Sequence, residues 1–405
     1  MPQDSESGFQ ARSFAIGTRL SPVSLPRILS ATSLILVLSL SGCGSGGSGG
    51  SSSSTGSGGS TGTGGSTGSG GSGSSNVYMA GSISSSATGG DTAMSWKNGT
   101  ATSLIDGVSY TEASAIAVDG SGNVYVAGIV SPQSVLHTIA AYWQNGTATN
   151  LPGGSSYSGA YGIAADNSGN VYVAGFTTSA SNNSIATYWK NGTATNLTDG
   201  SSFAVANAIT VDSSGNVYVA GSTTNVSANG TSPNTATYWK NGAATNLTDG
   251  TQYGGADAIT VDSGGNVYVT GITSSATTGH TIATCWKNGT AITLTDGTTD
   301  AGAGGIVVDG SGNVYIAGYI TSGSNFADTV PVYWKNGVAT SLTDGTTFGI
   351  ASVIAVDSSG NVYVAGSTTS ASNYTIATYW KNGTATNLSD GTSDAGISGI
   401  VLSSH

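Results

Sequence analysis

The feature that most constrains the fold of this chain is a sequence repeat with a period of 46 to 50 residues. The heptapeptide GNVYVAG spans Gly122 to Gly128, and a copy without the leading glycine begins at Asn76. Five more copies, some with single changes, begin at Gly169, Gly215, Gly265, Gly312 and Gly360. A second motif, YWKNG or a near variant, keeps step with them through Trp96, Trp143, Trp189, Trp239, Trp286, Trp334 and Trp380. A period in this range indicates a solenoid, a propeller or another repeat array.

Each repeat predicts four short strands and no helix. In the unit around Ile209 the strand-like segments are 208–211, 216–222, 235–240 and 244–248, each rich in Val, Ile, Thr, Tyr or Trp and bounded by turn residues. An Asn-Gly pair between the third and fourth segments favours a two-residue hairpin turn, in which both residues need positive φ. No segment keeps a 3.6-residue apolar period, so helices are not expected.

Four antiparallel strands repeated seven times predict an all-β, seven-bladed β-propeller over residues 76–405. A linear β-solenoid is the competing architecture, but its rungs are usually shorter and lack a fixed hairpin. The ends of the array favour the ring. The first unit lacks its AIAVD strand, and the chain ends on a surplus strand of that type at Gly399-Ile400-Val401-Leu402. We therefore expect the C-terminal strand to complete the N-terminal blade.

The segment before the repeats predicts a secreted, lipid-anchored protein. Ile28 to Leu40 is an apolar run too short to span a membrane, and it suits the core of a signal peptide. The following Leu40-Ser41-Gly42-Cys43 resembles a bacterial lipoprotein signal, which implies cleavage after residue 42 and acylation of Cys43. An ordinary secretory peptide with an incidental cysteine is the alternative. By resemblance to Gram-negative lipoproteins, Gly44 after the cysteine implies transport to the outer membrane, on the periplasmic side or at the cell surface. Residues 44–75, almost pure Gly, Ser and Thr, predict a flexible linker.

Charge limits the partners. All three Arg (Arg12, Arg19 and Arg27) precede the repeats, whose six Lys face 18 acidic residues, so the folded part carries about −12. Such a surface lacks the basic patch that nucleic acids or anionic membranes need, and we expect membrane contact only through the lipid anchor. A pair between Cys43 and Cys285 is implausible, so no disulfide framework is expected.

Two stretches of the repeat carry a family resemblance. AIAVDGSGNVYVAG resembles the repeats of bacterial β-propeller proteins of the SBBP type and is similar to NHL repeats, and YWKNGTATNL resembles HAF-type extracellular repeats. Together these stretches cover residues 76–402. The resemblance implies a propeller in an extracytoplasmic setting. It implies no single activity.

Candidate ligand-binding residues follow from where the repeat varies in length. Only the connection between the second and third strands varies, and it lies on the same face as the connection from one blade to the next. Variable loops carry function more often than the scaffold does. On this face the sequence places Tyr110, Tyr157, Phe203, Tyr253, Asp300, Phe348 and Asp394 at one repeat position. The five aromatic residues could stack on a sugar or a peptide, or they could fill the space between blades as ordinary core.

Two families of repeated aspartates suggest turns rather than metal sites. The VD turns contain Asp119, Asp166, Asp212, Asp262, Asp309 and Asp357. The TDG-type turns contain Asp106, Asp199, Asp249, Asp296, Asp344 and Asp390. Calcium needs six to eight oxygens, whereas each turn offers one carboxylate, so side-chain bonds to the backbone explain these residues and no metal is predicted.

Catalytic signals are sparse. His137, His280 and His405 occur singly, Glu112 is the sole glutamate of the folded part, and the sequence shows no cluster unique to one blade. We therefore predict no catalytic residues, no cofactor and a monomer. Three functions stay open: a binding or scaffolding module for an envelope protein or polysaccharide, a carbohydrate-active hydrolase or lyase using Asp residues of the variable face, and a structural spacer without a specific ligand.

Overall fold

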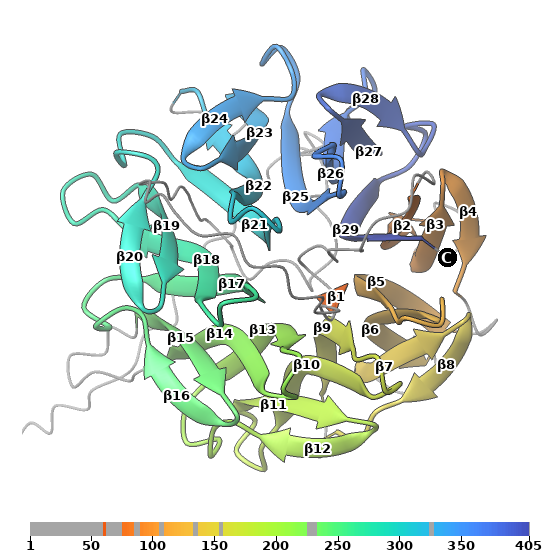
Figure 1. Ribbon diagram of the computed structural model, residues 1–405, viewed down its shortest axis with the longest axis vertical. Coiled ribbons are helices and arrows are strands. Elements are labelled where there is room, and N and C mark those ends of the chain that lie inside the picture. Colours follow the sequence, from red (N-terminus) through yellow and green to blue (C-terminus); the bar gives the residue numbers. More distant parts are fainter. Residues whose placement is uncertain are drawn as a thin grey trace, which may run out of the picture.

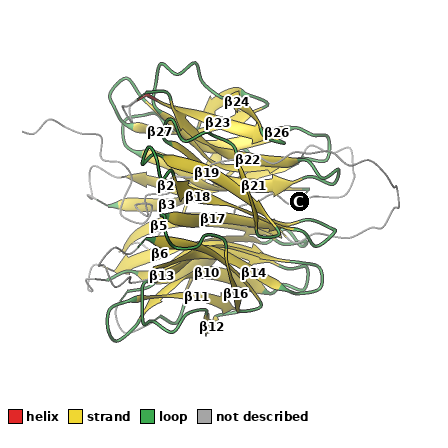
Figure 2. Ribbon diagram, turned by 90° about the vertical axis from the view of Figure 1, so that its left-hand side faces the viewer, coloured by secondary structure: helices red, strands yellow, loops and turns green. Residues whose placement is uncertain are grey.

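Seven β-sheets form a closed ring (Figure 1). The computed structural model describes residues 60–61, 75–84, 90–104, 109–132, 137–153, 157–224, 233–323 and 328–404, and these residues contain no α-helix. Seen from the side, the ring is a disc whose loops and turns gather at its two faces (Figure 2). The predicted seven-bladed propeller of four-stranded antiparallel blades is thus confirmed.

Strands of the same rank recur at the same distance from the ring axis. The innermost strands are β5 (Ser109–Val118), β9 (Gly159–Ala165), β13 (Ala204–Val211), β17 (Gly254–Val261), β21 (Ala301–Val308), β25 (Gly349–Val356) and β29 (Ala395–Ser403). The second strands are β2 (Asn76–Ser84), β6 (Val124–Pro132), β10 (Val171–Thr178), β14 (Val217–Thr224), β18 (Val267–Ser274), β22 (Val314–Thr321) and β26 (Val362–Thr369). The third strands are β3 (Asp91–Lys97), β7 (Ile139–Gln144), β11 (Ser184–Lys190), β15 (Asn234–Lys240), β19 (Thr281–Lys287), β23 (Thr329–Lys335) and β27 (Thr375–Lys381). The outermost strands are β4 (Thr100–Ser103), β8 (Thr147–Asn150), β12 (Thr193–Asn196), β16 (Ala243–Asn246), β20 (Thr290–Thr293), β24 (Val338–Ser341) and β28 (Thr384–Asn387).

The C-terminal strand closes the ring as expected. One sheet has the order β29-β2-β3-β4, with Met79 of β2 opposite Ile400 of β29 in an antiparallel register. A short strand β1 (Ser60–Thr61) pairs with the inner edge of β9 and gives that blade a fifth strand. Ser60 and Thr61 belong to the segment predicted to be the linker. Residues 44–59 and 62–74 of the linker and residues 1–43, with the predicted lipidation site Cys43, lie outside the described residues.

Tryptophans form the core between blades. All seven are at most 1% exposed. Trp143, for example, shares a cluster with Tyr78 and Ala80 of the preceding blade and with Ile116 and Val126 of its own. Burying such large aromatic side chains between adjacent sheets stabilises each blade against its neighbour.

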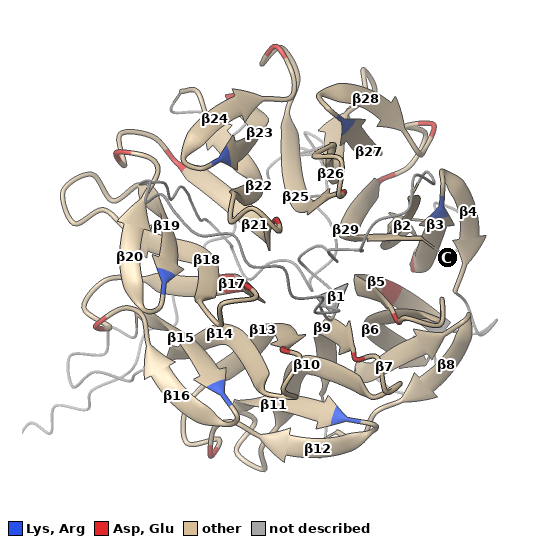
Figure 3. Ribbon diagram, viewed as in Figure 1, with Lys and Arg blue, Asp and Glu red and all other residues tan. Residues whose placement is uncertain are grey.

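On one face of the disc, the hairpin turn and the VD turn of the same blade are hydrogen-bonded to each other. Asn241 and Gly242 have φ values of 50° and 85°, as the predicted hairpin turn requires. The Asn241 side chain also accepts a hydrogen bond from the backbone of Val217 at 2.9 Å, which joins this hairpin to the VD turn of the same blade. Lys240 is exposed, as expected of an edge residue, but its ammonium lies 5.0 Å from the centre of the Tyr218 ring. The six lysines repeat this contact at equivalent places in six blades (Figure 3).

Each innermost strand is interrupted by a β-bulge. In β5 the register shifts between Ala113 and Ala115, which leaves Ser114 without a cross-strand partner residue in β6. Opposite the bulge the backbones approach so closely that a Cβ on Gly128 would lie 1.9 Å from the carbonyl oxygen of Glu112. The glycine of VYVAG therefore permits contact between two strands of one blade. The bulge is also the position where otherwise similar repeats differ most, with Ser114, Tyr161, Asn207, Asp257, Gly304, Ser352 and Ser398.

Candidate functional site on the variable-loop face

The connections that vary in length meet the connections between blades on one face. Asn183, between β10 and β11, donates its side-chain amide to the carbonyl of Gly200, between β12 and β13, at 3.0 Å. In another blade the Thr278 hydroxyl donates to the carbonyl of Gly297, at 2.7 Å. These contacts confirm the predicted arrangement of loops. They also fix the face on which the seven candidate residues lie.

Two of the seven candidates, Asp300 and Asp394, form hydrogen bonds between neighbouring blades. Asp300 Oδ1 accepts hydrogen bonds from the backbone N–H and the hydroxyl of Thr281, at 2.9 and 3.0 Å. Asp394 bonds Thr375 in the same way, at 2.8 and 3.1 Å. Each threonine begins the third strand of the preceding blade. The two carboxylates are thus engaged in structural contacts between blades.

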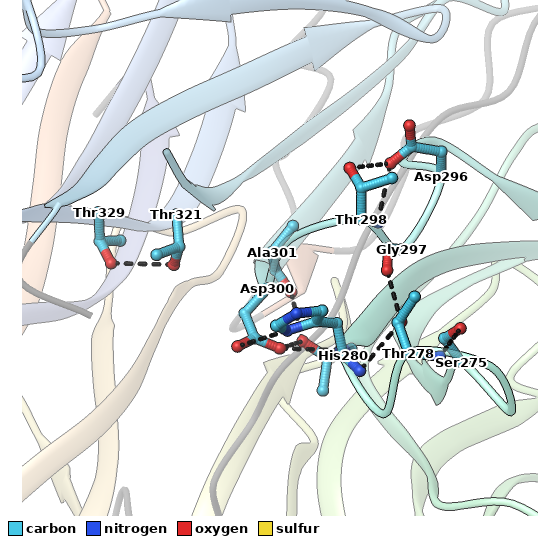
Figure 4. A network of polar contacts seen from close by, with 11 residues as sticks. Ser275, Thr278, His280, Asp296, Gly297, Thr298, Asp300, Ala301, Thr321 and Thr329 are labelled. Carbon is cyan, nitrogen blue, oxygen red and sulfur yellow. Dashed lines mark hydrogen bonds and ion pairs between the residues drawn. The ribbon is translucent and has the colours of Figure 1, made fainter. Parts of the chain in front are cut away.

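His280 adds a hydrogen bond to the contact made by Asp300 (Figure 4). Its Nδ1 lies 3.2 Å from Asp300 Oδ2, and both side chains are about one-third exposed. Burial opposes ionisation of Asp300, but the Thr281 amide and the His280 ring outweigh it and hold its pKa below the usual value. The pair spans the β18–β19 and β20–β21 connections. Sequence reasoning treated His280 as isolated because its partner is 20 residues away.

Tyr110 and Tyr253 also bond to the preceding blade. Tyr110 donates its phenol to Asp91 Oδ2 at 3.1 Å, and Tyr253 is hydrogen-bonded to Asn234. Both partners begin third strands. Burial, followed by the charge of Asp257, raises the pKa of Tyr253. Phe348 is half-buried at the equivalent place.

Tyr157 and Phe203 are different because their rings face solvent. Their side chains are 48% and 53% exposed, and they precede the innermost strands β9 and β13 of adjacent blades. The backbone of each is held, since Thr178 donates to the Tyr157 carbonyl at 2.5 Å and Thr224 donates to the Phe203 carbonyl at 2.8 Å. His137 packs edge-on against Tyr157, with ring centres 6.1 Å apart. The structure therefore offers two anchored, exposed aromatic rings, which we call the aromatic pair.

A buried carboxyl pair lies at one junction between blades, where the sequence showed no blade-specific cluster. Asp91 and Glu112 are 9% and 4% exposed, and the phenol of Tyr110 donates to both. Ser84 donates to Asp91 Oδ1 at 2.5 Å. Burial, the adjacent charge of Asp91 and a hydrogen bond with it raise the pKa of Glu112 to about 8. The expectation that no cluster of residues is unique to one blade was therefore wrong.

A signal for this pair was present in the alignment of the repeats. Glu112 stands where the other six blades have only Gly, Val or Ile, at Gly159, Val205, Gly255, Gly302, Ile350 and Gly396. Asp91 stands where the others have Thr, Ser or Asn. Only the fold shows that these two departures from the repeat, 21 residues apart in the chain, face each other.

The repeated aspartates serve turns, as predicted. Asp212 Oδ1 accepts from the backbone N–H groups of Ser214 and Asn216, both at 2.9 Å, and Oδ2 accepts from the Asn216 amide and the Tyr218 phenol. Asp249 accepts from the N–H and hydroxyl of Thr251. Asp106 lies outside the described residues. Across the described ranges, no three His, Cys, Asp or Glu side chains are grouped so that they could hold a metal ion, and no helix is long and apolar enough to cross a membrane.

Comparison with known sequences agrees with this geometry. A family described as "Beta-propeller repeat" (SBBP) matches residues 197–226 and 350–374, each of which contains a VD turn and a GNVYVAG motif. The chain is a β-propeller repeat protein. Among curated protein sequences, none matches it.

Solved structures resemble the chain only distantly. An acylaminoacyl peptidase of Pyrococcus horikoshii has 12% identity and a TM-score of 0.44, over 78% of this chain and 51% of the peptidase. A puromycin-hydrolysing peptidase of Mycobacterium tuberculosis has 11% identity and a TM-score of 0.48, over 74% and 50%. An ulvan lyase of polysaccharide lyase family 25 has 12% identity and a TM-score of 0.44, over 70% and 82%. The chain spans about half the length of the two peptidases. We transfer no activity from any of these proteins.

Proposed function

We propose that this β-propeller is a binding module that holds a glycan or a protein on its variable-loop face. The observation that supports it is the exposure of Tyr157 and Phe203 on adjacent blades, with their backbones anchored by hydrogen bonds. Exposed aromatic rings on a rigid support bind partners at low entropic cost, because few torsions are lost. Four of the other five candidate residues, Tyr110, Tyr253, Asp300 and Asp394, are hydrogen-bonded to the preceding blade.

The chemistry of the face favours an uncharged or cationic ligand. The folded part carries about −12, and its six lysines lie over tyrosine rings in the hairpin-turn face of the disc. A phosphorylated or sulfated partner would meet repulsion. A neutral sugar would present its C–H faces to the aromatic pair, and a peptide could place an apolar or basic side chain there.

The cellular setting completes the proposal. We propose that acylation of Cys43 anchors the protein in the outer membrane and that the Gly/Ser/Thr-rich segment separates the propeller from the lipid. Two or three acyl chains give stable anchoring, whereas one chain binds reversibly. Labelling with a radioactive fatty acid would test this, with Cys43→Ala as the comparison. Label retained in that variant would contradict anchoring at this residue.

The hydrolase or lyase alternative gains one candidate group, Glu112, because a carboxyl that keeps its proton near neutral pH can act as a general acid. Glu112 is only 4% exposed, however, and its Tyr110 and Asp91 neighbours bridge two blades. Its burial keeps it from a polymeric substrate. We therefore favour binding over catalysis.

A glycan array and calorimetry with the purified chain would test the binding proposal. Tyr157→Ala and Phe203→Ala should each weaken binding of the best ligand by tenfold or more, in line with the loss of a stacked aromatic contact. Tyr374→Ala is the matched control, because Tyr374 is also exposed, at 42%, but lies on another blade between β26 and β27. Equal losses in all three variants would argue against the aromatic pair. Unchanged affinity in Tyr157→Ala and Phe203→Ala would refute it.

A further inference from the structure

The junction between the closing blade and the next blade is crossed by several hydrogen bonds. The Ala93 N–H donates to the Thr111 hydroxyl at 3.0 Å, and the Ala113 N–H donates to the Ser82 hydroxyl at 3.2 Å. Ser398 of β29 donates its hydroxyl to the Ala113 carbonyl at 2.6 Å. Through these contacts β5 holds all three inner strands of the blade that closes the ring. We call this junction the closing seam.

The carboxyl pair lies in the closing seam. Asp91 comes from β3 of the closing blade, whereas Glu112 comes from β5 of the next blade. Tyr110, also on β5, donates to both carboxyl groups. Two carboxylates this close cannot both ionise without a large cost in a buried site, so such pairs share one proton.

The titratable groups that face Glu112 are acidic. Asp91 faces it from β3, Tyr110 lies beside it on β5, and Tyr161 faces it from β9. Burial, followed by the charge of Glu112, raises the pKa of Tyr161. Burial, together with the charge and hydrogen bond of Asp91, favours the protonated form of Glu112 and outweighs the hydrogen bond from the Tyr110 phenol, which favours the carboxylate.

We propose that Asp91 and Glu112 form a proton-operated latch: one shared proton holds the closing seam together, and loss of that proton forces the closing blade away from β5. In the protonated state the pair bonds across the seam and positions Tyr110 on the variable-loop face. In the deprotonated state two buried negative charges oppose each other, and water must enter the seam to solvate them. The closing seam therefore stays shut at neutral and mildly acidic pH and loosens at alkaline pH.

The direction of the pH effect follows from the raised pKa. Glu112 titrates near 8 in the folded chain and near its ordinary value of 4.5 in the unfolded chain. The stability it contributes is therefore fully present below about pH 4.5 and is lost as pH rises through about 8. Between these values the unfolding constant should increase by up to about tenfold per pH unit.

Urea unfolding of the full chain from pH 5 to pH 9 tests the latch. Relative to wild type, Glu112→Gln should flatten the rise of the unfolding constant, because the amide keeps hydrogen-bonding capacity and has no proton to lose. Asp257→Asn is the matched control, since Asp257 is a half-buried acid on β17, away from the closing seam. That variant should keep the wild-type slope. A Glu112→Gln slope equal to wild type would overturn the proposal.

Amide hydrogen exchange in the wild-type chain gives a second measurement that needs no variant. The Ala93 and Ala113 amides bond across the closing seam, whereas the Ala140 amide bonds Ser158 across another seam, at 2.9 Å. From pH 7 to pH 9, after correction for intrinsic exchange, protection at Ala93 and Ala113 should fall by up to about tenfold relative to Ala140. Equal changes at the two seams would overturn the latch even if the variant fails to fold.

Discussion

Thr343 lies where the hydroxyls of three other blades accept a backbone N–H, but the residue at the donor position is Pro331. Elsewhere Thr198 accepts from Ala186 at 3.1 Å and Thr248 accepts from Ala236 at 3.0 Å. The Leu342 N–H still donates to the Pro331 carbonyl at 2.8 Å, so the strands keep their register. Proline has no N–H to donate, and the buried Thr343 hydroxyl has no hydrogen-bond partner among the described residues; the equivalent Thr295 hydroxyl, opposite Ala283, has none either.

The same substitution should therefore have opposite effects in two blades. Thr248→Val leaves the Ala236 N–H without its acceptor and should lower the free energy of unfolding by about 1–2 kcal/mol. Thr343→Val removes a hydroxyl that is already unsatisfied, so the free energy of unfolding should stay unchanged or rise. Chemical denaturation of the two variants measures the difference. Equal destabilisation by both would contradict the role of Pro331.

Glycine is required at the hairpin turn between β15 and β16. It is dispensable at Gly310, which lies in the turn between β21 and β22 of another blade. Gly242 has a φ of 85°, so Gly242→Ala should cost about 1–2 kcal/mol although no atom lies within 4 Å of the added Cβ. Gly310→Ala is the control, because that position is equally open and its φ lies outside the left-handed region. Its stability should match wild type. Thermal unfolding of both variants would show whether backbone strain or side-chain packing decides.

The aspartates of the VD turns predict sensitivity to acid. Burial disfavours ionisation of Asp212, but bonds from Asn216, Tyr218 and Ser214 outweigh it and lower its pKa below 3.8. The stability it contributes is therefore present above about pH 4 and is lost as pH falls through its folded-state pKa. Asp212→Ala should cost about 2 kcal/mol at pH 6 and progressively less at lower pH.

Asp249→Ala is the control for this turn. Asp249 is exposed and bonds only within its own turn, to Thr251, so the loss should be smaller. Denaturation at pH 6 and pH 3 distinguishes the two roles. An Asp212→Ala effect that does not change with pH would mean that the carboxylate charge contributes nothing.

Most of the fold could be predicted from the repeat, because the same local sequence signals recur in seven units. Asn-Gly turns, alternating strand residues and buried Trp side chains each appeared at fixed spacing, and Asn241 and Trp143 behave as the pattern indicates. The complementary ends of the array also gave the β29–β2 pairing. Strand boundaries differ from the prediction by a few residues, since β13 begins at Ala204 rather than Ala208.

The candidate site was less predictable because it depends on contacts between blades. The sequence placed seven residues at one position, but it could not separate Tyr157, which is exposed, from Tyr110, which bonds Asp91. That difference arises from what the preceding blade presents at the start of its third strand. That the seven residues bind a ligand stays a prediction.

Closure by β29 gives the sharpest test of the ring. Deleting residues 395–405 removes Ile400 and Val401, both fully buried, and exposes the backbone edge of β2. An unpaired edge is a template for pairing with another chain, so the truncated protein should lose cooperative unfolding and elute as oligomers in gel filtration. A synthetic peptide of residues 394–404 should restore the monomer by occupying the vacant edge. Deleting only Ser404 and His405, which follow the last strand residue, should change neither property. A monomeric, cooperatively unfolding protein after the longer deletion would show that the ring holds without its closing strand.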